Sequence, residues 1–274
     1  SKPTRETNME QVVRDMVGRS ITEYYPGRTN EPGEIVLEVK NFCQDGLFNN
    51  ISFKLRKGEI LGVAGLMGAG RTEIMRALFG VDSCKHGEVY LHGKKVCIKK
   101  PEDAIKAGIG FITENRKSEG LILDFSISRN IALPSVDTFA KRSVINAKNE
   151  TAFSEALSKK LGVKTASIDL EAGALSGGNQ QKVVIAKWIG MNPSIIIMDE
   201  PTRGIDVGAK RDIYDLMNEL TSQGVAIIMV SSELPEVIGM SDRILVIHEG
   251  KIAGELDHEE ATQEKIITLA TGGQ

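Results

Sequence analysis

A glycine-rich stretch in the first third of the chain, GLMGAGRTE, has almost the spacing of a phosphate-binding loop. That pattern is glycine, four residues, glycine, lysine and then serine or threonine. Gly65, Gly70 and Thr72 fit it, and Arg71 stands in the place of the lysine. Backbone N–H groups of such a loop, with the helix N-terminus that follows, can cradle phosphate. By itself, the stretch is equally compatible with an ordinary glycine-rich turn. The phosphate site, if formed, comprises Gly65, Leu66, Met67, Gly68, Ala69, Gly70, Arg71 and Thr72.

Two later stretches carry groups that suit nucleotide chemistry. The apolar run SIIIMDEP ends in Asp199, which can hold Mg²⁺ together with the Thr72 hydroxyl, and Glu200, which can orient or polarise an attacking water. LSGGNQQK opens a helix at Ser176 and would form a second anion-binding helix N-terminus. The alternatives are a capping pair of acids and an ordinary N-cap beside a flexible turn. Asp206, in TRGID, is expected in the turn just past the acids.

Apolar strands and amphipathic helices alternate around these groups. GEILGVAG reads as a buried strand, and RTEIMRALFG as a helix with Ile74 and Leu78 on one face and Gly80 as its stop. SIIIMDEP, GVAIIMVSS and DRILVIHEG are short and apolar, as strands covered on both faces of a parallel sheet are. Helices are expected between them, for example over residues 210–223. The pattern predicts an α/β fold.

Two other regions follow different patterns. EIVLEVKNF, NNISFKL and GEVYLHGKKVCI read as short strands, with His92 and Gly93 as a hairpin turn. They predict an antiparallel flap beside the main sheet. Residues 115–190 have weak strand signals and are expected to be mostly helical, for example over residues 149–161.

Composition bounds the function. The 274 residues are 41% hydrophobic and 26% charged, as in a globular protein, and the net charge of −3 predicts no broad basic face for nucleic acid. Cys43, Cys84 and Cys97 form no C-x-x-C pair, which favours a reducing compartment. The longest apolar run, residues 60–70, falls short of the ~20 residues that span a membrane.

The two ends of the chain resemble each other. Residues 4–19 and 257–273 each have a polar start, an amphipathic helical pattern and a glycine end. Two unrelated surface helices are the alternative to a repeat. If the repeat is real, residues 1–33 are the tail of a preceding module plus a linker, and residues 34–274 are a second module.

The order of these motifs resembles the ATPases of ABC transporters, from about residue 34 to residue 274. The resemblance implies a P-loop, RecA-like core (residues 34–113 and 191–274) with an antiparallel β flap, and a helical subdomain (residues 114–190). GLMGAGRTE, DEPTRGIDVGAK, SSELPEVIGMSDRI and MVGR are similar to the second half of the tandem ATPase subunits of monosaccharide importers, ribose importers above all. That likeness favours the repeat and implies ATP and Mg²⁺ as cofactors.

The chain departs from the family pattern at one nucleotide site. The family has a glutamine where Glu114 stands, a switch histidine where Ser232 stands, and a lysine in place of Arg71. Arg71 keeps the charge, but its planar guanidinium differs in shape and hydration from an ammonium. The family usually stacks an aromatic residue on adenine; no residue is assigned to that position here, because Phe42 and Phe48 are expected in the core. These departures predict a degenerate site that binds ATP and hydrolyses it poorly, with Glu200 as its catalytic residue.

The resemblance also implies partners. Modules of this family pack head to tail, so the signature residues would serve the ATP of the other module; they are Ser176, Gly177, Gly178, Asn179 and Gln180. The expected partners are a preceding ATPase module in the same polypeptide, permease subunits docked near residues 114–133, and indirectly a periplasmic sugar-binding protein. This places the chain at the cytoplasmic face of the cell membrane. The rival hypotheses are a non-hydrolysing regulatory nucleotide-binding module and a soluble ABC protein of repair or translation.

Overall fold

A computed structural model describes residues 25–27, 30–141 and 144–273. The helix expected over residues 4–19 lies outside the described residues, and so does most of the repeat that it would form with the C-terminal end. The C-terminal member of that pair contains helix α10 (Gln263–Ala270), as its pattern predicts.

The main sheet has six strands in the order β12-β11-β3-β10-β9-β6. Neighbours from β11 to β6 are parallel, and β12 runs antiparallel to β11. Every residue of β6, β9 and β10 is buried, which explains why these strands carry no polar side chain except Asp199 at the end of β9. The strands are β3 (Ile60–Gly65), β6 (Ile109–Ile112), β9 (Ile195–Asp199), β10 (Ala226–Val230), β11 (Arg243–His248) and β12 (Lys251–Asp257).

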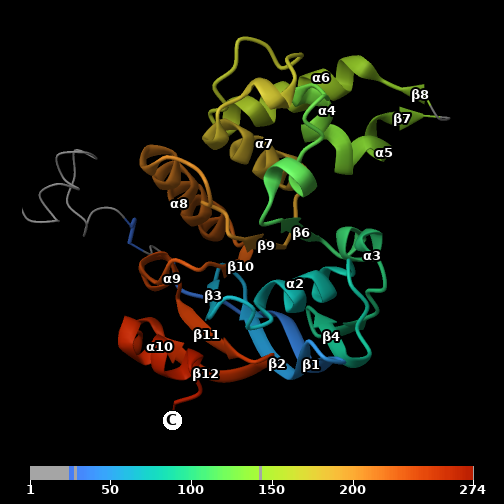
Figure 1. The fold of residues 1–274 in the computed structure, drawn as a ribbon. Helices are drawn as coiled ribbons and strands as arrows, with labels where there is room; N and C mark the ends of the chain where they lie inside the picture. The colour runs from blue at the N-terminus through green and yellow to red at the C-terminus, as the bar shows by residue number, and fades with distance from the viewer. Residues whose placement is uncertain (1–24, 28–29, 142–143, 274) are drawn as a thin grey trace, which may run out of the picture.

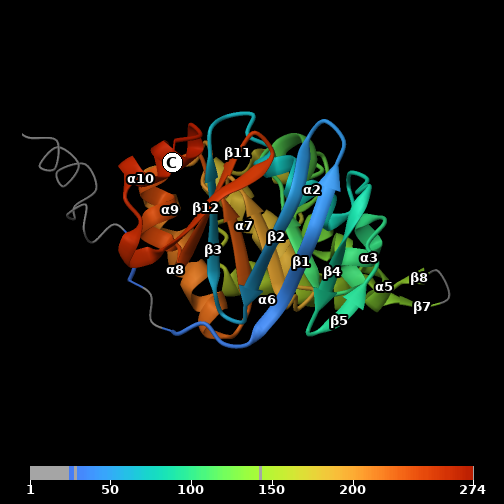
Figure 2. The same ribbon diagram turned by 90° about the horizontal axis from the view of Figure 1, so that it is seen from below.

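A second sheet is wholly antiparallel, in the order β2-β1-β4-β5, and Figure 2 shows β1, β2 and β4 side by side. Its strands are β1 (Ile35–Gln44), β2 (Phe48–Arg56), β4 (His86–Leu91) and β5 (Lys94–Val96). His92 and Gly93 join β4 to β5 with φ values of 47° and 73°, the left-handed pair that a tight hairpin requires. The predicted antiparallel flap is confirmed.

Helices follow the strands of the main sheet or gather at one end of the molecule. Helices α4 to α7 form that end group, at the top of Figure 1, and the mostly helical middle region is confirmed. The helices are α2 (Arg71–Phe79), α3 (Pro101–Lys106), α4 (Ile127–Ala132), α5 (Val136–Phe139), α6 (Ala147–Lys160), α7 (Gly177–Ile189), α8 (Val207–Ser222) and α9 (Leu234–Met240), besides α10. In the part of the chain that the structure describes, no helix has the length and apolarity needed to cross a bilayer.

Four strands of the structure were not predicted, and they are β6, β7, β8 and β12. β6 contains Gly110 within four residues, and a glycine inside a strand weakens the sequence signal. β7 (Ala140–Lys141) and β8 (Val144–Ile145) form a two-residue hairpin, too short to give a period. β12 lies at the sheet edge and alternates exposed with half-buried residues, after a turn in which Glu249 and Gly250 both have positive φ.

Aromatic side chains join the sheet to the helical end group. The Phe79 ring, at the last residue of α2, lies 5.3 Å from the Phe111 ring on β6. It also meets the Trp188 ring of α7 edge-on, with 5.6 Å between centroids. All three side chains are buried. Edge-to-face and tilted contacts of this kind add to the stabilisation from buried area, so the Phe79 ring holds α2 to both β6 and α7.

The described part of the N-terminal segment packs on α8 and α9. The Tyr25 ring lies 5.3 Å from the buried Tyr214 ring of α8. The Asn218 amide donates to the carbonyl oxygens of Pro26 and Gly27, at 3.2 and 3.3 Å. The segment therefore approaches the main sheet along α8.

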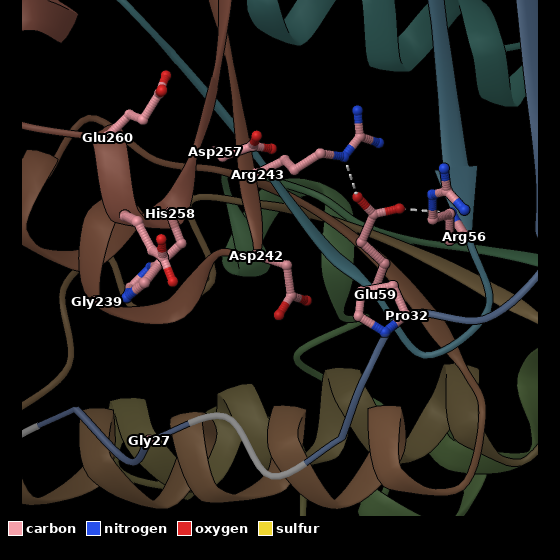
Figure 3. A pocket seen from close by; sticks show the side chains of 11 residues that line it. Gly27, Pro32, Arg56, Glu59, Gly239, Asp242, Arg243, Asp257, His258 and Glu260 are labelled. Atoms are coloured by element: carbon pink, nitrogen blue, oxygen red, sulfur yellow. Dashed lines mark hydrogen bonds and ion pairs between the residues drawn. The ribbon is translucent and has the colours of Figure 1, made fainter.

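A hollow of about 840 Å³ opens beside this segment, at the end of the sheet where β3 begins. Glu59 lines it and is fully buried (Figure 3). Its carboxylate accepts the Arg56 backbone N–H at 2.5 Å and the Arg243 Nε–H at 2.7 Å. Glu59 is thus a buried acid with both oxygens paired.

Candidate nucleotide site

The glycine-rich loop joins β3 to α2, as the sequence predicts. Gly68 and Gly70 have φ values of 78° and 99°, a region that glycine enters without strain. Gly65 lies against the backbone carbonyl of Ile247 on β11, so a side chain there would overlap that carbonyl. The loop consequently curls tightly over the end of the sheet, at the N-terminus of α2, which is a favourable place for an anion.

A pocket of about 620 Å³ opens at this loop. The nucleotide-contacting residues predicted from the sequence all line it, and Glu200 does so too. Arg71 turns back toward the sheet and donates from Nη1 to the backbone carbonyl of Ser231, 2.8 Å away. The pocket-lining residues are Gly65, Leu66, Met67, Gly68, Ala69, Gly70, Arg71, Thr72, Glu73, Glu114, Glu200, Arg203 and Ser232.

Asp199, the last residue of β9, lies beneath the pocket and is only 1% exposed. Neither of its carboxylate oxygens has a hydrogen-bond partner among the residues that the structure describes. Burial raises its pKa to about 6. The Thr72 hydroxyl lies near enough to oppose that rise in pKa but makes no hydrogen bond to Asp199 in the described structure. An unpaired buried carboxylate beside a threonine hydroxyl is an arrangement that suits a hard cation.

Glu200 occupies a strained position at the pocket wall. Its φ is 49°, in the left-handed region that non-glycine residues rarely adopt. Its backbone N–H donates to the Val230 carbonyl at 2.8 Å, and its carboxylate accepts the Ser232 hydroxyl at 3.2 Å. Burial raises the pKa of Glu200, while the Ser232 hydroxyl and Arg71 oppose that rise. The predicted catalytic acid and the serine in the histidine position are thus direct partners.

Glu114 forms an ion pair with Arg203 at the mouth of the pocket. The sequence reading placed Glu114 there but did not single out Arg203. The arginine lies only three residues after Glu200 and donates its backbone N–H to the Glu200 carbonyl at 3.1 Å. Its nearness in sequence to the acid pair was the one signal that could have found it.

The signature residues lie outside this pocket. They differ in burial: Ser176 is exposed, Asn179 is half-buried, and Gly178 and Gln180 are buried. The Asn179 amide donates to the Ser176 hydroxyl at 3.0 Å, and Gln180 donates to the Ala172 carbonyl at 3.3 Å. A separate hollow of about 420 Å³ opens beside them, lined by Lys164, Ser176, Gly178, Asn179, Lys182, Asp206, Gly208, Ala209 and Asp212.

Asp206 is the N-cap of α8 and accepts the Ala209 N–H at 3.0 Å. It therefore lies in the turn past the acid pair, as expected, and also borders the hollow of the signature residues. Gly177 is half-buried at the start of α7. A Cβ atom added to it would lie 2.7 Å from Arg116 Nη2.

Arg116 connects the signature helix to the turn after β9. Its two terminal nitrogens donate to the backbone carbonyls of Arg203 and Gly204, at 2.6 and 3.0 Å. Its Nε lies 3.4 Å from the Gln180 side-chain oxygen. The sequence analysis missed Arg116, because an arginine at the start of a short helical turn (Arg116–Gly120) has no pattern that distinguishes it from other surface residues.

Phe42 and Phe48 belong to the core, as expected. They are 4% and 3% exposed, and their rings lie 5.5 Å apart and nearly parallel. Neither is among the residues that line the pocket. Leu47, which precedes Phe48 and is 44% exposed, brings its carbonyl to 3.3 Å from the position that a Cβ on Gly70 would take.

Comparison with solved structures identifies the same fold. An ATP-binding cassette of an ABC transporter, in its ADP conformation, superposes with a TM-score of 0.73 at 23% identity, covering 87% of this chain and 99% of that one. The dimeric post-hydrolysis state of another ATP-binding cassette, bound to ADP and Pi, gives a TM-score of 0.69 at 22% identity, covering 81% and 98%. The predicted ABC ATPase fold is confirmed.

Sequence comparison finds nearer relatives. The chain is 62% identical over 269 residues to the ribose import ATP-binding protein RbsA of Oceanobacillus iheyensis, covering 98% of this chain and 54% of that protein. It is also 62% identical over 269 residues to RbsA of Bacillus subtilis, covering 98% and 55%. The chain therefore spans about half the length of the curated relatives it matches.

The family match covers the loop, the signature residues and the acid pair together. It extends over residues 48–203, which is more than half of the chain, and the family is described as ABC transporter. With the cassette fold and the pocket at the glycine-rich loop, this match leads to one conclusion: the chain belongs to the ABC transporter family of ATPases.

Proposed function

We propose that this chain is one ATP-binding module of a ribose importer, which couples the binding and hydrolysis of ATP to sugar uptake. The pocket of residues 65–73 with Glu114, Glu200, Arg203 and Ser232 carries the proposal. Ribose as the sugar rests on the names of the relatives. The proposed partners are a preceding ATPase module, permease subunits at the cytoplasmic face of the membrane and, indirectly, a periplasmic sugar-binding protein.

The residues present fit a Mg²⁺ ion bound with the nucleotide. The two oxygens of Asp199 lack partners among the described residues, and the Thr72 hydroxyl is the nearby neutral oxygen. Hard divalent cations take oxygen ligands of this kind, and bound with ATP they neutralise phosphate charge. Asp199 and Thr72 are therefore the residues that would hold the ion.

The nucleotide site of this module is proposed to be weak in catalysis. The three unusual residues all line one pocket, and each is engaged with protein: Arg71 with the Ser231 carbonyl, Glu114 with Arg203, and Ser232 with Glu200. A catalytic site needs donors placed for the transition state rather than for the ground state. This arrangement suits binding of ATP better than its hydrolysis.

The signature residues are proposed to complete the site of the other module. Three of them, Ser176, Gly178 and Asn179, border a hollow that is distinct from the nucleotide pocket. The N-terminus of α7, at Gly177, has a favourable dipole for phosphate. The module would then contribute one intact half-site while owning a weakened one.

Comparison of two variants in the complete transporter tests this asymmetry. Gly177→Asp places a negative charge and a side chain at the N-terminus of α7, and is expected to abolish ribose uptake and ATPase activity. Glu200→Gln acts at the weakened site and should lower uptake far less. Equal loss in the two variants would show that the site of this module is catalytic and would overturn the asymmetry.

A non-hydrolysing regulatory module is the second candidate, favoured by the same three residues of the pocket. Glu200 and Asp199 argue against it, because regulation by binding needs no catalytic acid. Single-turnover hydrolysis in the complete protein, with the other module inactivated, separates the two. Slow but measurable cleavage of ATP, lost in Glu200→Gln, would exclude the purely regulatory function.

A further inference from the structure

Glu236 is a fully buried acid in the first turn of α9, close behind the nucleotide pocket. It accepts the Thr202 hydroxyl at 2.7 Å on one oxygen and the Ser231 hydroxyl on the other. Thr202 is 1% exposed and Ser231 is fully buried. One carboxylate thus joins the loop after β9 to the loop after β10.

The two hydroxyls stand next to the groups that line the pocket. Thr202 follows Glu200 by two residues. Ser231 precedes Ser232, and its backbone carbonyl accepts Arg71 at 2.8 Å. The Ser231 hydroxyl also accepts the Glu233 N–H at 3.0 Å, which fixes its direction. Displacement of the Glu236 carboxylate would therefore shift the backbone next to both Glu200 and Ser232.

The backbone of Glu200 needs such support. Its left-handed conformation is disfavoured for a residue with a side chain, so the surrounding structure must hold it. The Val230 carbonyl fixes its N–H, and the Thr202–Glu236 hydrogen bond fixes the chain two residues later.

We propose that Glu236 is a positioning residue of the nucleotide site: its carboxylate holds Glu200 and Ser232 in the places where they meet the terminal phosphate of ATP. It touches no nucleotide itself. The inference rests on the proposed function. Burial raises the pKa of Glu236, and hydroxyl groups of Ser231, Thr202 and Tyr214 oppose that rise by favouring the charged form.

A matched pair of alanine variants of the full chain tests the proposal. Glu59 is the control, because it is equally buried, accepts two hydrogen bonds (Figure 3) and directly precedes β3, at the end of that strand away from the glycine-rich loop. The Kd values for Mg-ATP and Mg-ADP are measured by calorimetry. For Glu236→Ala we expect the Kd of Mg-ATP to rise about tenfold, the effect of about one lost hydrogen bond, with the Kd of Mg-ADP changed less than about twofold. Glu59→Ala should lower the thermal midpoint and leave both Kd values within about twofold.

Two further variants separate position from charge. Glu236→Gln keeps the length of the side chain and can accept a hydrogen bond from one hydroxyl while donating one to the other. The ratio of the Mg-ATP and Mg-ADP Kd values should therefore stay within about twofold of the ratio in the parent chain. Glu236→Asp keeps the acid but is one methylene short, and should change that ratio as the alanine does. If Glu236→Ala does not fold, this second pair decides.

The outcomes are distinct. An unchanged ratio in Glu236→Ala, or in Glu236→Asp if the alanine variant does not fold, would overturn the positioning role, and so would an equal change of ratio in Glu59→Ala. Absence of Mg-ADP binding by the parent chain would instead overturn the proposed nucleotide site, on which Glu236 is only a secondary element.

Discussion

Asp199→Asn should stabilise the ligand-free chain by an amount that grows with pH. The folded protein keeps the Asp199 proton up to a pKa of about 6, whereas the ordinary value is 3.8. Between these two values the folded state binds more protons than the unfolded state. The free energy of unfolding therefore falls as pH rises through this window. Asparagine has no such titration, so the variant escapes that loss.

The magnitude follows from the two pKa values. A difference of about two pH units corresponds to about 3 kcal/mol once the group is ionised in both states. The ionisable Asp199 destabilises the folded parent by about 1.6 kcal/mol at pH 5 and about 3 kcal/mol at pH 8. The difference in free energy of unfolding between variant and parent should therefore widen by about 1.4 kcal/mol over this range. The asparagine amide, itself lacking an evident partner, lowers the gap by a constant amount. The change with pH is therefore the informative quantity.

Urea unfolding at pH 5, 6, 7 and 8, without Mg²⁺ or nucleotide, measures the difference in free energy of unfolding between Asp199→Asn and the parent. Met198→Leu is the control, because Met198 is a buried neutral neighbour on β9 and its effect should not depend on pH. Parallel stability curves for parent and Asp199→Asn would refute the argument, since they would mean that the carboxylate has a partner or is already solvated in the folded protein.

Three further outcomes are expected. The chain should bind Mg-ATP weakly in calorimetry, and Gly70→Val should abolish the heat, because position 70 has a φ of 99° and lies 3.3 Å from backbone atoms of Leu47 and Gly250 at its Cβ position. Steady-state phosphate release should stay far below the ~1 s⁻¹ common in enzymes, and Arg71→Lys should not restore it, because Glu114 and Ser232 remain; robust turnover by the parent chain would contradict the weak site. Phe79→Ala should lower the free energy of unfolding by about 3 to 5 kcal/mol, since it removes the ring that contacts both Phe111 and Trp188. A loss below about 1 kcal/mol in urea titration would contradict the stabilising role of these aromatic contacts.

The parts that could be predicted from the sequence are those that a local pattern dictates. The run of residues 195–198 is apolar because the strand is covered on both faces, and this pattern predicted both the strand and the place of the acid Asp199 at its end. Gly70 stands where the backbone must take a left-handed turn into α2, so spacing alone located the loop. His92 and Gly93 likewise predicted a tight turn, and both have positive φ.

The parts that escaped prediction depend on contacts between distant residues. Arg116 meets the turn at Gly204 across 88 positions, and Thr202 meets Glu236 across 34. No periodicity records such pairings, and the polar residues involved look like ordinary loop or helix residues. The strand Lys251–Asp257 was missed for a different reason: none of its residues is fully buried, and Ala253 and Gly254 interrupt the alternation of polar and apolar side chains in its sequence.

The aromatic contact between α2, β6 and α7 has a mechanical consequence. The phosphate loop and the signature residues each occupy the N-terminal end of a helix whose other end is held at this contact. From Trp188 to Gly177 the lever arm is about 17 Å, at 1.5 Å per residue. A rotation of about 10° about the contact would carry the start of α7 through an arc of about 3 Å, roughly the length of a hydrogen bond. A small repacking of these three rings, if it rotated α7, would therefore displace the signature residues by a distance comparable with a hydrogen bond.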